Sequence, residues 1–139
     1  MNNKNKANLS IYDVPETYQR YLCEIYAISL TKKGAWVNNK EIADKLNVNP
    51  ASVSGILYKL KENNLIVWKP RSPIRLTKEG KQIAKHLSET KALLEIFFKK
   101  VLKIKDIKLI KELSCEMEHH ISIEVKIKFQ EFLNGYLKQ

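Results

Sequence analysis

Apolar side chains near the start of the chain recur at the three- and four-residue spacing of an α-helix. This pattern predicts a helix over about residues 15–32, because Pro15 is tolerated in a first helical turn and Gly34 is a natural stop. The face that this helix buries consists of Tyr18, Leu22, Ile25 and Tyr26.

Two shorter helices are predicted next, joined by the turn "NVNP". The first lies in "NNKEIADKLNVN", with Asn39 as its expected cap. The second lies in "NPASVSGILYKLKENN", where one apolar stripe is formed by Val53, Leu57 and Leu60. Two short helices around a tight turn are typical of a helix-turn-helix motif.

A β-hairpin is predicted after this motif. The short β-type runs "LIVWK" and "IRLT" are separated by the turn "PRSP". The tip of the hairpin is expected to carry Lys69, Arg71 and Arg75. A hairpin that follows a helix-turn-helix is a wing.

The remainder of the chain has helical spacing. Thr77 is expected to cap a long helix over about 77–101, and two further helices are expected at about 106–120 and 122–136. The long helix carries more apolar surface than one small domain needs, so some of it is expected to face a partner. The predicted fold is mainly α, a winged helix-turn-helix continued by an all-helical unit.

Charge adds a polyanionic partner to this picture. The net charge is +10 and the pI is about 9.6, and residues 59–75 hold five basic residues against the single acid Glu62. Lys and Arg that neutralise phosphates release condensed counterions, so nucleic acid is the expected partner. A lysine-rich overall composition is the alternative explanation of the charge.

No apolar run approaches the roughly 18 residues that a membrane span needs, so no membrane association is expected. The polar segment at 1–14 is interpreted as a flexible tail without the apolar core of a secretory signal, which predicts a cytoplasmic protein. No Gly-rich phosphate loop, nucleophile elbow or acid–base pair is present in the sequence, so neither an enzyme nor a small organic substrate is expected.

The second helix of a helix-turn-helix enters the major groove of double-stranded DNA, with its first residues against the base edges. The alternative is an ordinary solvated helix face, but the basic wing directly behind it favours DNA binding. The predicted DNA-binding residues are Asn49, Pro50, Ala51, Ser52, Ser54, Tyr58, Lys59, Lys61, Lys69, Arg71 and Arg75.

The stretch "LSCEMEHHIS" concentrates groups that can bind metal ions. Helical geometry places Cys115, Glu118 and His119 on one face, away from the apolar stripe that contains Ile110 and Leu113. That face is either solvated or a metal site. The other cysteine, Cys23, is 92 positions away and forms no CxxC pair, so the spacing indicates neither a disulfide scaffold nor a zinc ribbon.

Several segments, in this order, resemble the diphtheria toxin repressor and manganese transport regulator family over about residues 17–133. They are "YLCEIYAIS", "EIADKLNVNPASVSGILYKLKENNLI", "IRLTKEGKQIAKHL", "LLEIFF" and "EMEHHIS". The length is similar to that of the short manganese-regulator branch, which lacks a C-terminal SH3-like domain. The resemblance implies a homodimeric, metal-controlled regulator of metal homeostasis, most simply a repressor. It assigns DNA binding to residues 15–76, and dimerisation and metal sensing to residues 77–139.

By the same resemblance, the metal ligands are Cys23, Cys115, Glu118 and His119, and Glu95 belongs to an ancillary site. The chain departs from the family where Arg20, Lys91 and Lys111 occupy ligand positions. A fixed cation beside a metal ion raises the cost of binding it.

Two explanations of these departures stay open. A smaller site of thiolate, imidazole and carboxylate would favour Fe, Zn or Co over Mn. Alternatively, Arg20 and Lys91 replace the ion by pairing with Glu118 and Glu95, and no metal is bound. The regulator would then be metal-independent, or would respond to thiol oxidation through Cys23 and Cys115.

Overall fold

The computed structural model describes residues 14–139, which form two compact units that divide after Lys85. Residues 1–13 of the predicted tail lie outside this range. Val14, the last residue of that prediction, is only 4% exposed, and its carbonyl accepts a 2.8 Å hydrogen bond from the side-chain amide of Gln19. The tail prediction is therefore wrong at Val14, which belongs to the apolar core.

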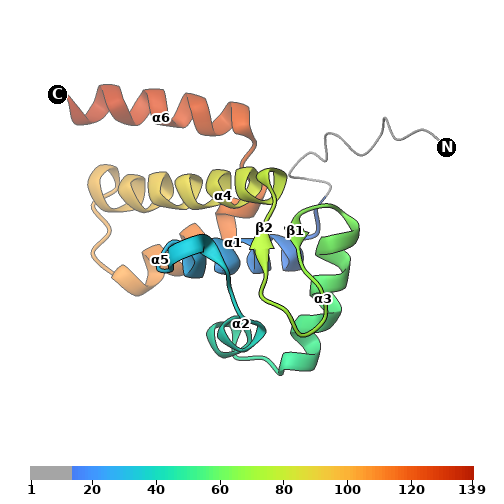
Figure 1. Ribbon diagram of the computed structural model, residues 1–139. Helices are drawn as coiled ribbons and strands as arrows, with labels where there is room; N and C mark the ends of the chain where they lie inside the picture. The colour runs from blue at the N-terminus through green and yellow to red at the C-terminus, as the bar shows by residue number, and fades with distance from the viewer. Residues whose placement is uncertain (1–13) are drawn as a thin grey trace. The chain divides into compact units, whose positions relative to one another are not determined.

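The first unit is a winged helix-turn-helix, as predicted (Figure 1). Its elements are α1 (Glu16–Ser29), a 3-10 turn (Lys33–Ala35), α2 (Asn39–Leu46), α3 (Pro50–Glu62), β1 (Ile66–Val67), β2 (Arg75–Leu76) and the start of α4 (Lys78–Ile96). The strands β1 and β2 are antiparallel, with Ile66 opposite Leu76 and Val67 opposite Arg75. An isolated bridge between Val37 and Ile74 places a third extended segment beside β2.

The apolar stripes predicted from spacing form the core of this unit. Leu22, Ile25, Val53, Leu57 and Leu60 are all 0% exposed. Helices α1, α2 and α3 therefore pack their inward faces together, and this packing fixes the orientation of α3.

The second unit consists of helices and helical turns. It contains the rest of α4, a π-helical turn (Phe97–Val101), α5 (Ile107–Met117), a 3-10 turn (Glu118–His120) and α6 (Ile123–Leu137). Helix α6 runs alongside α4 (Figure 1), with an ion pair between Glu89 and Lys126 and an edge contact between Phe97 and Phe129. The helix predicted over 106–120 thus remains α-helical only to Met117.

Two cap predictions have different outcomes. Asn38, not Asn39, caps α2, because the side chains of Asn38 and Glu41 form a reciprocal capping box. Thr77 caps α4 as predicted, since its hydroxyl accepts a 3.1 Å hydrogen bond from the amide of Gly80. The Asn39 side chain instead donates a hydrogen bond to Ser54.

The division after Lys85 falls inside α4, whereas sequence analysis placed the domain boundary at residue 76. That boundary stays a prediction. Within residues 14–139, none of the helices has the length and apolar character needed to span a membrane.

Gly80 allows the first turn of α4 to lie against the backbone of Leu65. A Cβ atom at position 80 would lie 2.1 Å from the Leu65 carbonyl oxygen, so the backbone would have to move. We expect Gly80→Ala to lower the free energy of unfolding by about 1–3 kcal/mol, the usual cost of overpacking. Urea denaturation measures this change.

Gly55→Ala is the matched control, because Gly55 is also helical and an added Cβ would meet nothing within 4 Å. This variant is expected to keep or raise the stability, since Ala favours a helix over Gly by up to about 1 kcal/mol. Equal effects of the two substitutions would contradict the packing argument.

Candidate nucleic-acid interface and metal centre

A network of polar side chains joins the beginnings of α2 and α3. The Asn49 side chain accepts a 2.9 Å hydrogen bond from the amide of Ala51 and caps α3. The Asn39 amide donates to the Ser54 hydroxyl at 3.1 Å, and that hydroxyl donates to the Pro50 carbonyl at 3.2 Å. These bonds fix the angle at which the first turn of α3 leaves the turn after α2.

Most of the predicted DNA-binding residues are exposed in this structure. The exception is Ser54, which is half-buried and whose hydroxyl accepts a hydrogen bond from Asn39. The exposed members are Asn49, Pro50, Ala51, Ser52, Tyr58, Lys59, Lys61, Lys69, Arg71 and Arg75. The front of α3 therefore presents small side chains, which allow another surface to approach closely.

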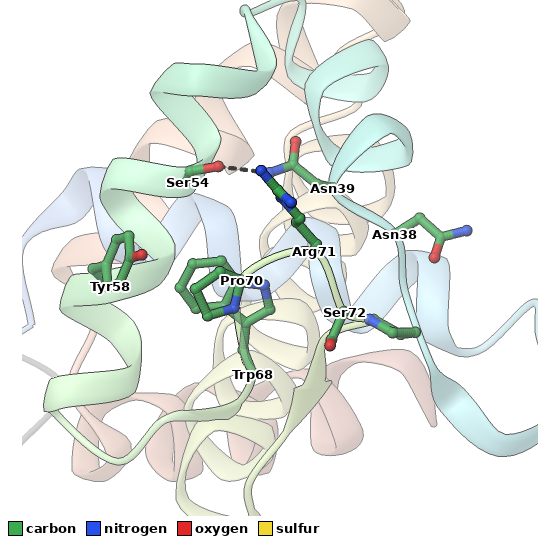
Figure 2. Close-up of a pocket in the computed structure, with 9 residues that line it drawn as sticks. Asn38, Asn39, Ser54, Tyr58, Trp68, Pro70, Arg71 and Ser72 are labelled. Carbon is green, nitrogen blue, oxygen red and sulfur yellow. Dashed lines mark hydrogen bonds between the residues drawn. The ribbon is translucent and has the colours of Figure 1, made fainter.

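The wing is attached to α3 through two aromatic rings. Tyr58 of α3 and Trp68 of the wing make an edge-on contact, with ring centroids 4.9 Å apart. A cleft of about 390 Å³ lies between α3 and the wing, and Figure 2 shows Arg71 of the wing and Asn39 and Ser54 of the helices lining it. None of the residues that line this cleft is acidic.

Arg75 does not lie at the tip of the wing, contrary to the sequence prediction. It pairs with Val67 inside the small sheet, and its guanidinium lies over the Trp36 ring, 5.6 Å from the ring centroid. Arg71 does lie in the turn, with a φ of 64°, which is unusual for a non-glycine residue. The two arginines therefore occupy different parts of the wing.

The candidate metal ligands at the end of α5 belong to the second unit, and two of them are buried. Glu118 is 4% exposed, His119 is 5% exposed, and Nε2 of His119 lies 3.5 Å from Oε1 of Glu118. Cys115, one turn earlier, is half-buried with a free thiol. His120 is exposed. A carboxylate and an imidazole this close together are donors that divalent transition metals accept.

The solvated-face alternative for this segment is wrong, because Glu118 and His119 are buried. Two apolar side chains of α5 face solvent instead, since Ile107 is 61% exposed and Met117 is 37% exposed. The change from α-helix to 3-10 turn after Met117 alters the direction of the following side chains, which uniform helical spacing does not capture.

The other residues of the predicted metal centre lie on different elements. Cys23 is half-buried on α1 in the first unit, and Glu95 is half-buried on α4. Arg20 is bonded to Glu16 at 2.9 Å. In the described part of the chain, no ion pair joins Lys91 to Glu95, so the lysine part of the ion-replacement alternative lacks support.

Within residues 14–139, no three His, Cys, Asp or Glu side chains form a group that could hold a metal ion. Glu118 and His119 supply two suitable donors. A complete site would need further donors, and the half-buried thiol of Cys115, one turn earlier, has suitable chemistry.

His86 holds the segment that follows the candidate metal ligands, a role that sequence analysis did not assign to it. Its Nε2 lies 3.0 Å from the carbonyl oxygen of Ile121, two residues after His119. The Thr90 hydroxyl donates to the His86 carbonyl at 2.7 Å, and Lys126 pairs with Glu89. Burial lowers the pKa of His86 below its ordinary value of 6.5. No local motif marks this residue, because its partner is 35 positions away.

Two family models match consecutive parts of the chain. Residues 13–74 match the model described as "Iron dependent repressor, N-terminal DNA binding domain". Residues 77–138 match the model described as "Iron dependent repressor, metal binding and dimerisation domain". Together the matches include both α3 and the buried Glu118–His119 pair.

Several transcriptional regulators are similar in sequence to more than half of this chain. The transcriptional regulator MntR of Shouchella clausii is 33% identical over 102 residues, which are 73% of this chain and 68% of that protein. MntR of Listeria monocytogenes is 38% identical over 77 residues, 55% of this chain and 53% of its own length. An uncharacterised helix-turn-helix regulator of Methanocaldococcus jannaschii is 26% identical over 87% of this chain and 95% of that protein.

Solved structures with similar folds belong to longer chains than this one. The manganese regulator SloR has a TM-score of 0.68 and 29% identity, and ScaR with bound Zn²⁺ has a TM-score of 0.69 and 26% identity. Both matches cover 84% of this chain but only 53% of the other chain. The chain thus spans about half the length of several of its relatives.

The lowered pKa of His86 predicts a pH-dependent stability. His86 stays neutral in the folded protein while the unfolded chain binds a proton more readily, so the free energy of unfolding should fall as the pH drops below about 6.5. The variant His86→Gln lacks the titrating imidazole. The difference in free energy of unfolding between wild type and this variant should therefore decrease as the pH is lowered from about 7.5 to about 5.5. Urea denaturation across this range measures it.

His120→Gln is the matched control, because His120 is exposed, and its pH profile should follow that of the wild type. Parallel profiles for wild type and His86→Gln would show that the buried imidazole does not contribute to the pH dependence.

Proposed function

Because this chain belongs to the iron-dependent repressor family, we propose that it is a homodimeric transcriptional regulator whose operator binding is controlled by a divalent metal ion. The observation that carries this proposal is the buried pair of Glu118 and His119 in the domain matched to metal binding. The exposed front of α3 and the basic wing supply the surface for DNA. We place such a protein in the cytoplasm with the DNA, and propose repression of metal-homeostasis genes as its role.

Helix α3 is the proposed recognition helix. Its N-terminal residues from Asn49 to Ser52 are exposed and small, so the helix can enter the major groove up to the base edges. Arg71 and Lys69 on the wing would bind phosphates on the adjacent backbone. The aromatic contact between Tyr58 and Trp68 supports this arrangement, because it holds the wing against the recognition helix.

Glu118, His119, Cys115 and Cys23 are the proposed metal ligands. Their donor set of carboxylate, imidazole and thiolate favours Fe, Zn or Co over Mn, since soft ligands select softer ions. Structures of ScaR, which has a similar fold, with bound Zn²⁺ and with bound Cd²⁺ support a divalent metal ion as the ligand. Glu95 is a candidate for an ancillary ligand, and it is half-buried on α4.

The ligand positions suggest how metal binding would act on DNA binding. Cys23 lies on α1, which packs against α2 and so reaches the helix-turn-helix through the core. Glu118 and His119 lie in the second unit, where His86 holds the residue that follows them. An ion bound to these ligands would shift the DNA-binding equilibrium only to the extent that its affinity differs between conformations of the protein.

The second unit also offers a surface for a second copy of the chain. Its small core leaves large apolar side chains exposed, including Ile107, Ile123 and Phe132 at 61%, 59% and 52%. An apolar groove of about 430 Å³ is lined by residues such as Phe97, Met117 and Val125. Exposed apolar surface of this extent is typical of an interface, and the match to a dimerisation domain supports a homodimer.

Removal of the His119 imidazole tests the metal-dependent function. We expect His119→Ala to abolish metal-stimulated DNA binding, because one of the two adjacent donors is lost, while weak metal-independent binding remains. The measurement is fluorescence anisotropy of an operator duplex selected from a random pool, with chelator, Mn(II), Fe(II) or Zn(II) in parallel.

His120→Ala is the control for this substitution, because His120 adjoins His119 in sequence but is exposed. It should retain the metal response. DNA binding that is indifferent to chelator and to all three metals would refute metal control and favour the metal-independent alternative.

A further inference from the structure

The small sheet of the wing has an outer face with an unusual composition. Strand alternation directs Val37, Ile66 and Ile74 into the core, where they are at most 3% exposed. Trp36 and Val67 point outward instead, 42% and 53% exposed.

Arg75 joins these two residues into one row. It lies directly opposite Val67 in the sheet, and its guanidinium lies 5.6 Å from the centroid of the Trp36 ring. A guanidinium that is stacked on an indole is already ordered, so it loses little conformational entropy when it binds an anion. Its N–H groups can still donate hydrogen bonds to that anion. The outer face therefore presents an ordered cation with apolar side chains on both sides.

A cleft of about 790 Å³ lies beside this row. Residues on its walls include Trp36, Lys61, Asn64, Val67, Lys69 and Ser72. Two of them are cationic, two are neutral hydrogen-bonding residues, and none of the lining residues is acidic. The chemistry of the cleft thus fits an extended anion that also offers apolar surface.

We propose that this outer face of the wing is a second DNA contact, which binds the sugar–phosphate backbone of duplex DNA outside the segment read by α3. Arg75 and Lys61 bind phosphates, and Trp36 and Val67 pack against deoxyribose. The inference rests on the proposed function in that α3 must bring the duplex to the protein. It adds a surface that lengthens the footprint beyond the recognition helix and the wing tip.

An acidic protein segment would be the rival occupant of the same cleft. Duplex DNA is favoured because three cations line or adjoin the cleft, and because regularly spaced phosphates with sugars between them match alternating cationic and apolar groups.

Tryptophan fluorescence tests the proposal directly. The chain has two tryptophans, so Trp68→Phe leaves Trp36 as the only one, and Phe can keep the edge contact with Tyr58. Acrylamide quenching of Trp36 is measured in the full-length protein with a 40-bp random-sequence duplex at low salt. Anisotropy of the labelled duplex in the same samples reports binding.

Strong protection of Trp36 from acrylamide at DNA saturation is expected, with no protection by a poly-glutamate peptide. If anisotropy shows binding but quenching is unchanged, this proposal is overturned while DNA binding stands. If the peptide protects Trp36 as well as DNA does, an acidic protein is the occupant. If anisotropy shows no binding, the proposed function fails as well.

Two surface variants keep the test independent of Trp68→Phe. Trp36→Ala removes an exposed side chain. It should weaken binding of the duplex by about two- to fivefold, because the Arg75 guanidinium loses the ring on which it stacks. Lys61→Ala should reduce the salt slope of binding by about one, while Lys99→Ala, exposed in the second unit, should not. Unchanged affinity for Trp36→Ala would overturn the proposal.

Discussion

The burial of Glu118 beside His119 is the constraint on which this account depends. A carboxylate taken out of water is costly unless charge or hydrogen bonds compensate for the lost solvation. The chain places this carboxylate and an imidazole 3.5 Å apart, and His86 and the Glu89–Lys126 pair hold residues that follow them. We propose that a divalent cation uses both donors, because carboxylate and imidazole are common ligands of such ions.

The helix-turn-helix could be predicted from the sequence because its signals are local. The stripe of Val53, Leu57 and Leu60 defines α3, and Asn49 and Pro50 mark its first turn. The location of the candidate metal ligands Glu118 and His119 was harder to predict. Uniform helical spacing placed the candidate ligands on one face without deciding whether that face is solvated or a metal site. In the structure Glu118 and His119 are buried and lie in the 3-10 turn after Met117, which the spacing did not predict.

The wing shows the same limit. Two β-type runs and a turn predict the hairpin, but the position of Arg75 depends on the bridge between Val37 and Ile74, a contact between segments far apart in sequence. Likewise, neighbouring asparagines left the cap of α2 ambiguous, and the structure gives that role to Asn38 while Asn39 bonds to Ser54. Sequence patterns located the elements, whereas long-range contacts determined which side chains they expose.

The central proposal is that a divalent metal ion binds to Cys23, Cys115, Glu118 and His119. The most direct measurement is the thiolate-to-Co(II) charge-transfer absorption of the Co(II)-loaded full-length protein, compared among wild type, Cys23→Ser and Cys115→Ser. The account predicts that wild type shows this absorption and that each substitution removes part of it. A Co(II) spectrum without thiolate charge transfer, or one that neither substitution changes, would contradict it.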